Sequence, residues 1–283
     1  MKVDFHVHST ASDGTFTPTQ IMAMAKDFRA IALTDHDNCD GFPEFKGVPG
    51  VELSIEPGDG FDKFHLLGLG VDYNHEGLKA FLRQVLKWRN ERNERIFANF
   101  HRLGIDIKPD PHGEVLARPH FARWLYENGY TSSAPEAFDK YLASDAPKAT
   151  RCYETRRHPA QQDAIDIIHQ AGGIAIMAHP KYWKDDWKLS GPDYELAEKE
   201  LARLKEMGLD GLEALYEANT IEENIQFTRI ADRLGLLKSA GSDFHGTNKP
   251  TIALGMEVPE SFISPLLSRL LRDGVKYDII CES

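Results

Sequence analysis

The chain has few cysteines and no membrane-length apolar run. Of its 283 residues only Cys39, Cys152 and Cys281 are cysteines, and none of them stands in a CxxC spacing. This odd, scattered set gives no disulfide framework and indicates a reducing compartment. No apolar stretch approaches the ~20 residues of a membrane-spanning helix, and a charged segment rather than a secretory signal follows Met1. We therefore expect a cytoplasmic protein with no membrane partner.

The chain also lacks a surplus of positive charge. It has 33 Lys and Arg residues against 44 Asp and Glu residues, which gives a formal net charge of -11. A surface of this sign does not favour a long nucleic acid, although bound divalent cations would offset part of the charge where a phosphate must lie. The composition therefore favours a small anion, such as a nucleotide or a sugar phosphate, held in a local positive pocket.

Apolar runs typical of strands alternate with segments typical of helices up to residue 72 and again from residue 150. The expected strands cover 2–8, 30–34, 50–55, 63–71, 174–178, 211–215 and 237–240, and the expected helices cover 17–29, 160–171, 194–207 and 221–234. Thr17 is the expected N-cap of the first helix, with Pro18 at its first position. This alternation predicts an α/β fold with a parallel sheet or barrel.

The pattern changes between residues 73 and 149, where helical segments follow one another without a convincing strand. A long helix is expected at 76–103, and shorter helices at 121–127 and 135–142. The charged run at 89–95 is typical of a solvated helix face. We therefore predict a barrel formed by 1–72 and 150–283, which carries the functional site, and a helical insertion at 73–149 that contributes to the substrate pocket.

Histidines and acidic residues gather at the ends of the predicted strands, where the residues of a parallel barrel converge on one face. Alternation along a strand puts His6 and His8 on the same side, as two ligands of one metal require. Imidazole and carboxylate are ligands of Zn, Mn and Fe. The sequence therefore predicts a multinuclear metal site. Its expected ligands are His6, His8, Asp13, His36, Glu52, His65, His179, Asp243 and His245.

Each of these residues taken alone indicates a metal site less strongly than the nine residues do together. His65 stands in an apolar strand and, taken alone, would suit a core histidine; only the surrounding pattern favours a ligand. Glu52 is expected to bridge two cations, because each of its carboxylate oxygens can hold one. The remaining histidines in loops or on helix faces are expected on the surface: His75, His101, His112, His158 and His169.

A basic group stands at the start of a helix in the insertion, Arg118-Pro119-His120-Phe121-Ala122-Arg123. Two arginines, a histidine and a helix N-terminus favour an anion, although a solvent-exposed basic helix start would have the same sequence. The predicted substrate-binding residues are Arg118, His120, Arg123, Lys148 and Lys181.

The ordered set HxH…D, TDHD, GVE, H, AHP and SDFH resembles the polymerase-and-histidinol-phosphatase (PHP) domain over nearly the whole chain. The resemblance implies a distorted (β/α)7 barrel with three divalent metal ions, Mn, Fe or Zn, at its C-terminal face. It implies the following ligands: His6, His8, Glu52 and Asp243 for the first metal; Glu52, His65 and His179 for the second; Asp13, His36 and His245 for the third.

The helical insertion and its basic group are similar to one PHP subgroup, which acts on nucleoside 3',5'-bisphosphates and on short RNA 5' ends. The resemblance favours a phosphoesterase in which a hydroxide held between metals attacks phosphorus, with Glu52, Asp243 and His120 as catalytic residues and a nucleoside 3',5'-bisphosphate as substrate. Three alternatives stay open: a cyclic phosphodiesterase acting on a sugar cyclic phosphate, a 5'-3' exonuclease on short RNA, and an accessory metal-binding PHP domain without activity. Segments 146–153 and 181–183 depart from the subgroup's sequence pattern at positions where the substrate is expected to bind.

Overall fold

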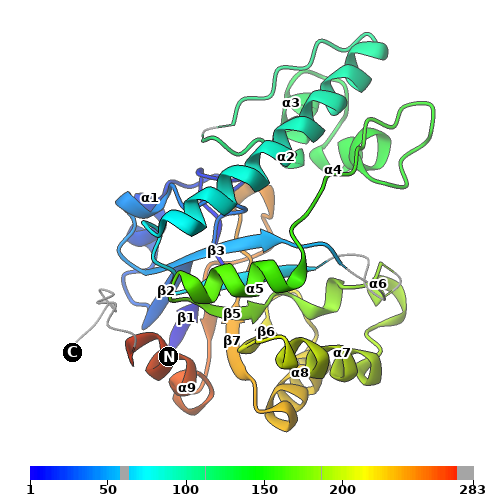
Figure 1. The fold of residues 1–283 in the computed structure, drawn as a ribbon. Helices are drawn as coiled ribbons and strands as arrows, with labels where there is room; N and C mark the ends of the chain where they lie inside the picture. Colours follow the sequence, from blue (N-terminus) through cyan, green and yellow to red (C-terminus); the bar gives the residue numbers. More distant parts are fainter. Residues whose placement is uncertain (58–63, 112, 186, 273–283) are drawn as a thin grey trace.

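The computed structural model describes residues 1–57, 64–111, 113–185 and 187–272 (Figure 1). Cys281, His112 and Lys63, the first residue of the fourth expected strand, lie outside the described residues. In the part of the chain that is described, no helix combines the length and apolar character needed to cross a membrane.

Eight strands form a nearly closed barrel whose hydrogen-bonded order is β7-β6-β5-β4-β3-β2-β1-β8. They are β1 (Lys2–Asp4), β2 (Ala30–Leu33), β3 (Val48–Ser54), β4 (His65–Leu69), β5 (Ile174–Met177), β6 (Gly211–Tyr216), β7 (Leu237–Gly241) and β8 (Met256–Glu257). The ring closes where β1 meets β7: the Phe5 amide donates to the Ala240 carbonyl at 2.9 Å, and Val7 forms a parallel bridge with Phe244. The predicted barrel is confirmed, with the short β8 antiparallel beside β1.

The direction of β4 differs from the prediction. We expected a parallel strand with His65 within it, but β4 pairs antiparallel with both β3 and β5. No helix was expected between the third and fourth strands, and antiparallel neighbours need no crossover helix. Because β4 runs the other way, its first residue, His65, lies at the same end of the barrel as the last residues of the parallel strands.

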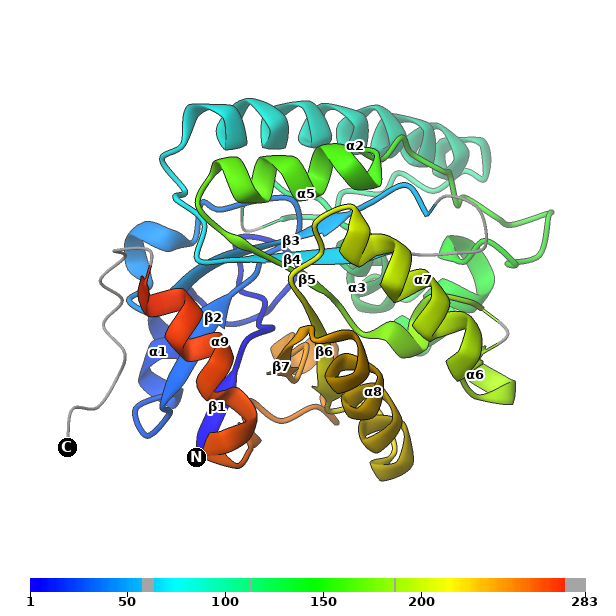
Figure 2. The same ribbon diagram turned by 60° about the horizontal axis from the view of Figure 1, so that its bottom comes forward.

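Helices surround the barrel (Figures 1 and 2). The longer ones are α1 (Pro18–Met24), α2 (Glu76–Arg102), α5 (Gln161–Gln170), α7 (Tyr194–Glu206), α8 (Ile221–Leu234) and α9 (Glu260–Arg272); a short turn, α6, covers Trp187–Ser190. Thr17 caps α1 as predicted: its side chain accepts from the Gln20 amide, and the Gln20 side chain accepts from the Thr17 amide. The helix ends at Met24 rather than at residue 29, and α9 was not predicted.

The barrel interior is filled by small and branched side chains of the strands, including Val3, Leu67 and Ile176. Ile263 and Leu266 of α9 belong to the same core, so α9 closes the barrel end beside the N-terminus (Figure 1). The opposite end of the barrel is therefore the one left for polar groups.

Helix α2 belongs to two apolar cores. Its first half packs through Leu78 and Leu82 on the barrel side, together with α5. Its second half, with Ile96 and Phe100, packs against α3 (Arg118–Glu127), α4 (Ala134–Ala137) and the π-helical turn Phe138–Leu142. The second half of α2 and the segment up to Cys152 thus share a separate apolar core, while the first half of α2 packs on the barrel (Figure 1); the bounds 73–149 of the insertion stay a prediction.

We expect Phe100→Ala to loosen the insertion without disturbing the barrel. Phe100 is fully buried and its ring stacks on Phe121 with a centroid distance of 6.3 Å. Removing a buried phenyl ring costs about 3–5 kcal/mol. Hydrogen exchange should become faster in the second half of α2 and in α3, while metal binding stays at the wild-type level. Faster exchange throughout the strands would show that 73–149 is not a separate unit.

Candidate metal centre

The structure brings the predicted ligands together at the end of the barrel opposite α9. Three overlapping groups have ligand atoms within 4.8 Å of one another, and each group could hold a cation. They are His8, Asp13, His36 and His245; His6, His8 and Glu52; and Glu52, His65 and His179. The ninth residue, Asp243, lies against the first two groups: its Oδ1 is 3.2 Å from Nδ1 of His245 and 3.4 Å from Nε2 of His8.

Glu52 stands between the groups and divides its two oxygens among them. Oε1 lies 2.7 Å from Nδ1 of His65 and 3.0 Å from Nε2 of His179. Oε2 lies 2.8 Å from Nδ1 of His36 and 3.1 Å from Nε2 of His8. This is the arrangement that a bridging carboxylate needs.

Backbone strain is concentrated at this end of the barrel. Among the described residues, only Asp37, His179 and Asp243 have positive φ angles without being glycine, at 52°, 27° and 59°. Left-handed backbone is uncommon for such residues, and it persists only where the surrounding structure imposes it. All three residues belong to or adjoin the ligand set, so the chain is bent to aim side chains at one point.

The ligand atoms fit a set of cations. Several of them are buried and make no hydrogen bond: Nε2 of His6, Nε2 of His8, Oδ1 of Asp13, Nδ1 of His36 and Oε2 of Glu52. Some of these atoms lie close together, such as His36 and Glu52, without hydrogen-bond geometry. Buried polar atoms are nearly always satisfied, and lone pairs that converge on one another are satisfied by divalent metal ions.

Metal binding needs neutral imidazoles and ionised carboxylates, and the histidines of the site differ in this respect. Burial lowers the pKa of His65 to about 4 and that of His245 to about 4. Burial is outweighed at His6 by the charges of Glu213 and Glu52, which raise its pKa well above the ordinary value, and at His8 by Asp243 and Glu52, which raise its pKa to about 9, so a metal would displace a proton from each. Burial works against the charge of Glu52, but the neighbouring His36, His65 and His6 outweigh it and hold the pKa of Glu52 well below its ordinary value. Asp243 behaves in the same way: Lys249 and His245 outweigh burial and keep its pKa low.

Glu213, in the middle of β6, supports two ligands and was missed by the sequence analysis. It is fully buried; its Oε1 lies 3.0 Å from Nδ1 of His6, and its Oε2 accepts from the His179 amide at 2.6 Å. A carboxylate on Nδ1 fixes the ring so that Nε2 faces the cluster. A lone acidic residue inside an apolar strand was the only available signal.

Tyr216 and Lys249 hold the outer oxygen of Asp243 and were also missed. The Tyr216 hydroxyl donates to Oδ2 of Asp243 at 2.9 Å, and the Lys249 ammonium donates to the same oxygen at 2.5 Å. Oδ1 stays directed at the histidines. The two carboxylate oxygens therefore have different partners.

A cluster of buried arginines lies beside the metal ligands. Arg89 and Arg92 of α2 are each only 5% exposed, so the predicted solvated face at 89–95 is wrong for them. Asp37 accepts from Arg89 and, at 2.8 Å, from Arg156. Burial and then the charges of Arg89, Arg156 and Arg118 lower the pKa of Arg92 to about 8. We call these four residues the arginine cluster; Asp37 is the carboxylate paired with it.

One predicted substrate-binding residue, Arg118, belongs to this cluster, and His120 follows it two positions later in α3. Arg118 interacts electrostatically with Arg89 and with Asp13, and its guanidinium lies 5.4 Å from the centre of the Tyr153 ring. His120 is buried at the start of α3, where its Nδ1 accepts from the Ala117 amide at 3.0 Å.

The other three predicted substrate-binding residues are placed differently. Arg123 donates to the Asp110 carbonyl at 3.2 Å, and Lys148 is exposed. The Lys181 ammonium donates to Glu223 at 2.9 Å and to the Ala218 carbonyl at 2.9 Å. The structure thus gives Arg123 and Lys181 protein partners of their own.

The histidines that were expected on the surface differ among themselves. His101 and His169 are exposed, whereas His75 caps α2 and His158 is half-buried. Burial, and then the charge of Arg156, lowers the pKa of His158 to about 3. His158 is therefore a neutral ring beside the arginine cluster rather than a surface group.

We expect Glu213→Gln to weaken metal binding by roughly 10- to 100-fold, because it removes the carboxylate that orients His6. Titration calorimetry of metal-free protein with Mn2+ or Zn2+ measures the effect. Glu198→Gln is the matched control, since its carboxylate pairs with Arg233 on the exposed surface. Equal affinities for the two variants would contradict the assigned role of Glu213.

Known proteins similar to this chain are phosphoesterases. No family model matches the chain. A 3',5'-nucleoside bisphosphate phosphatase from Chromobacterium violaceum is 32% identical over 260 residues, which cover 86% of this chain and 87% of that protein. A 5'-3' exoribonuclease from Haemophilus influenzae is 33% identical over 261 residues, which cover 86% of this chain and 90% of that protein.

The fold is shared with solved structures as well. An amidohydrolase from Chromobacterium violaceum, solved with bound sulfate and no metal, superposes with a TM-score of 0.81 at 29% identity, covering 96% of this chain and 97% of that one. The similarity in sequence, the barrel and the converging ligands agree with one another. This chain belongs to the PHP family of metal-dependent phosphoesterases, which are hydrolases of phosphoric ester bonds.

Proposed function

We propose that this phosphoesterase acts on a nucleoside 3',5'-bisphosphate. The observation that carries the proposal is the arginine cluster, where the charges of four buried guanidinium groups act on one another and the carboxylate of Asp37 pairs with two of them, Arg89 and Arg156. Nε of Arg89 and Nη1 of Arg156 are buried without a hydrogen-bond partner. Buried like charges repel one another strongly unless an anion joins them. A phosphate accepts hydrogen bonds from several arginines at once.

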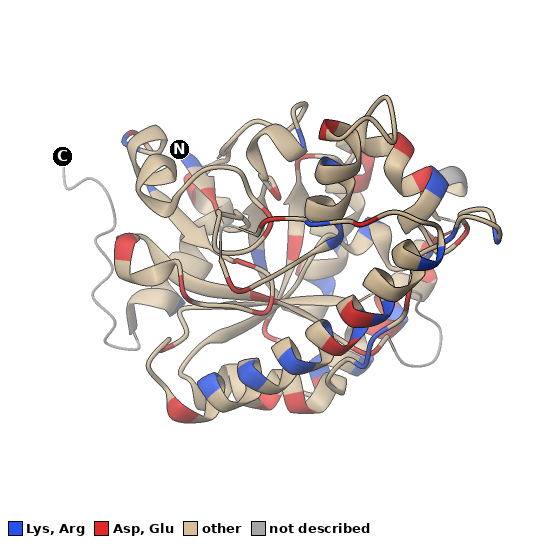
Figure 3. Cartoon of the chain, turned by 90° about the horizontal axis from the view of Figure 1, so that it is seen from above, with Lys and Arg blue, Asp and Glu red and all other residues tan. Residues whose placement is uncertain are grey.

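The cluster is a local feature rather than part of a basic surface. Lysines and arginines are otherwise interspersed with acidic residues along the chain (Figure 3). It is also close to the metal ligands, because Asp37 follows His36 and because Arg118 interacts with Asp13. A substrate with one phosphate at the ligands and a second at the arginine cluster would use both groups, as a 3',5'-bisphosphate can.

We assign three divalent metal ions to the nine ligands. His6, His8, Glu52 and Asp243 would hold one, Glu52, His65 and His179 a second, and Asp13, His36 and His245 a third. When bound, such cations make water a nucleophile at neutral pH and offset charge on the phosphate. The protein's own part is to orient these ligands through Glu213 and to fix the substrate through the arginine cluster and the start of α3 with His120. Mn, Fe and Zn all suit this mixed ligand set.

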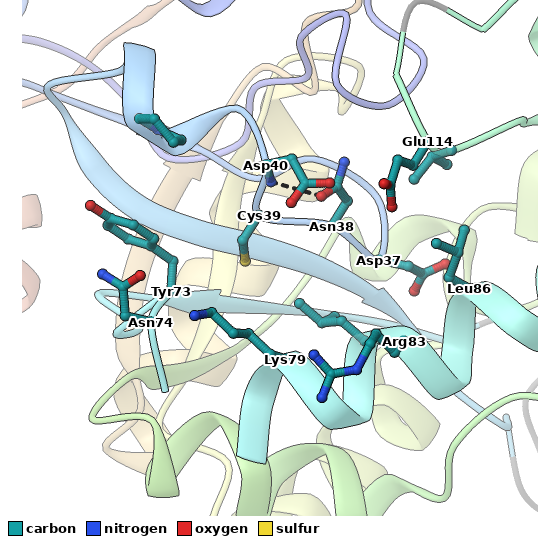
Figure 4. A pocket seen from close by; sticks show the side chains of 13 residues that line it. Asp37, Asn38, Cys39, Asp40, Tyr73, Asn74, Lys79, Arg83, Leu86 and Glu114 are labelled. Carbon is teal, nitrogen blue, oxygen red and sulfur yellow. Dashed lines mark hydrogen bonds between the residues drawn. The ribbon is translucent and has the colours of Figure 1, made fainter. Parts of the chain in front are cut away.

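A short RNA with a 5' phosphate is the second candidate substrate, and one feature favours it. A cavity of about 340 Å³ lies beside Asp37, between the first half of α2 and the loop that follows His36 (Figure 4). Lys79, Arg83 and Leu86 line one wall, and Asn38 and Asp40 another. The cavity provides room next to the arginine cluster for more than a phosphate. The complete ligand set speaks against an accessory domain without activity, and nothing in the site favours a cyclic phosphate.

The three-metal assignment can be counted. Protein loaded with Mn2+ or Zn2+ and freed of excess metal by gel filtration should contain about three ions per chain by elemental analysis, since nine ligands with one bridge suit three cations. Glu52→Gln should lower this number, because an amide bridges cations poorly. A wild-type content of one ion or fewer would refute the assignment.

The role of the arginine cluster is tested by Arg92→Met. This change removes a charge that the other three arginines repel, so the free energy of unfolding should rise, while kcat/KM for adenosine 3',5'-bisphosphate should fall by roughly 10- to 100-fold, the range for a lost charged hydrogen bond. Hydrolysis of p-nitrophenyl phosphate, which has a single phosphate, should change much less.

Two outcomes would count against this role. Equal losses on both substrates would mean that Arg92 serves the reacting phosphate. Unchanged activity on both, with a folded and metal-loaded variant, would remove the main support for a bisphosphate substrate.

A further inference from the structure

Lys249 stands at the metal centre on a fixed piece of backbone. It follows the short 3-10 turn Gly246–Asn248, which comes directly after the last predicted ligand, His245. The Asn248 side chain donates to the Asp13 carbonyl at 2.7 Å, and the Thr247 amide donates to the Thr15 hydroxyl at 2.9 Å. The loop is therefore hydrogen-bonded to the segment that carries Asp13, and the backbone of Lys249 is held in a defined position.

The ammonium of Lys249 reaches the ligands from solvent. It donates to Oδ2 of Asp243, and its charge also interacts with Asp13 and Glu52. The Lys249 side chain is 39% exposed, whereas that of Asp243 is 8% exposed and that of the candidate ligand His65 is 25% exposed. Lys249 thus offers a cation at the open side of the cluster.

Asp243 does not depend on Lys249 alone. Its Oδ2 also accepts from the buried hydroxyl of Tyr216 at 2.9 Å. Cations held by Oδ1 and the surrounding histidines would repel the ammonium and weaken its hold on the same carboxylate. A long, flexible lysine side chain then needs another anion within reach.

We propose that Lys249 binds the reacting phosphate of the substrate, a role that rests on the proposed function. In the free protein its ammonium is held by Asp243; in the complex it contacts a phosphate oxygen. The arginine cluster meets the ligand set beside His36, through Asp37, whereas Lys249 meets it at Asp243. The arginine cluster is hydrogen-bonded to Asp37, which is not one of the nine ligands, and Lys249 to the ligand Asp243, so each cationic group can serve one phosphate of a bisphosphate.

The test compares Lys249→Met with Tyr216→Phe, because each removes one hydrogen bond to the same oxygen of Asp243. Binding of inorganic phosphate to the metal-loaded proteins is measured by calorimetry, and metal content by elemental analysis. Lys249→Met should bind phosphate roughly 10- to 100-fold more weakly, the range for a lost charged hydrogen bond, with full metal content. Tyr216→Phe, once fully loaded, should keep its phosphate affinity.

Lys238→Met serves as a neutral control. Lys238 pairs with Asp232 at the other end of β7, and its loss should leave phosphate affinity unchanged. Thermal unfolding confirms that each variant is folded. Kinetics on adenosine 3',5'-bisphosphate should show a higher KM or a lower kcat for Lys249→Met, with metal content unaltered.

The possible results distinguish a failure of the role proposed for Lys249 from a failure of the proposed bisphosphate substrate. Unchanged phosphate binding by Lys249→Met would overturn the proposal. An equal loss of phosphate affinity in Tyr216→Phe, accompanied by loss of metal, would also overturn it, because Lys249 would then be a positioning residue for Asp243. If the wild type binds phosphate through Lys249 but hydrolyses no bisphosphate, the proposed substrate fails while the role of Lys249 stands.

Discussion

The buried carboxylate of Glu52 is the group on which the rest of the site depends. Taking an ionised carboxylate out of water costs several kcal/mol unless other charges and hydrogen bonds compensate. Here the compensation comes from histidines that approach its two oxygens from four segments of the chain: His6, His8, His36, His65 and His179. Because these segments must meet at one point, the lengths and directions of the strands that carry them are constrained as well.

Two groups of opposite charge lie side by side in the site, and most of their charges are not paired with each other. The ligand set contributes the carboxylates of Asp13, Glu52 and Asp243, and the arginine cluster contributes four guanidinium groups. Asp37 lies between them: it follows His36 in the chain and accepts from Arg89 and Arg156. Asp37 adopts a strained left-handed backbone conformation in order to reach this position. A small molecule with two anionic groups, one bound to metal ions at the ligand set and the other to the arginine cluster, would satisfy both sets of charges at once.

Much of this arrangement could be predicted from the sequence, because it rests on local signals. Apolar runs identified seven of the eight strands and missed the short β8, Thr17 and Pro18 marked the start of α1, and the spacing of His6 and His8 placed two candidate ligands on one face. The gathering of histidines and acidic residues at the predicted strand ends identified the other candidate ligands, and the family resemblance grouped them around three metals, which stays a prediction.

What escaped prediction depends on contacts between distant segments. Arg89 and Arg92 have the spacing of a solvated helix face, and only Arg156 and Asp37, far away in the chain, show that this face is buried. The direction of β4 is decided by its neighbours in the sheet, not by its own residues. A single glutamate in a strand, Glu213, does not reveal that it faces His6.

The closure of the barrel has a consequence for the order in which the protein is made. The seam between β1 and β7 joins the beginning of the chain to a segment near its end, and ligands stand on both sides of it, from His6 to Asp243 and His245. At about 5–20 residues per second, a ribosome needs roughly 12 to 50 s to pass from the first of these ligands to the last. Until then the histidines of the first strands have no complete partner set, and the first metal would have only part of its ligands. The nine candidate ligands therefore cannot come together before the ribosome has passed His245.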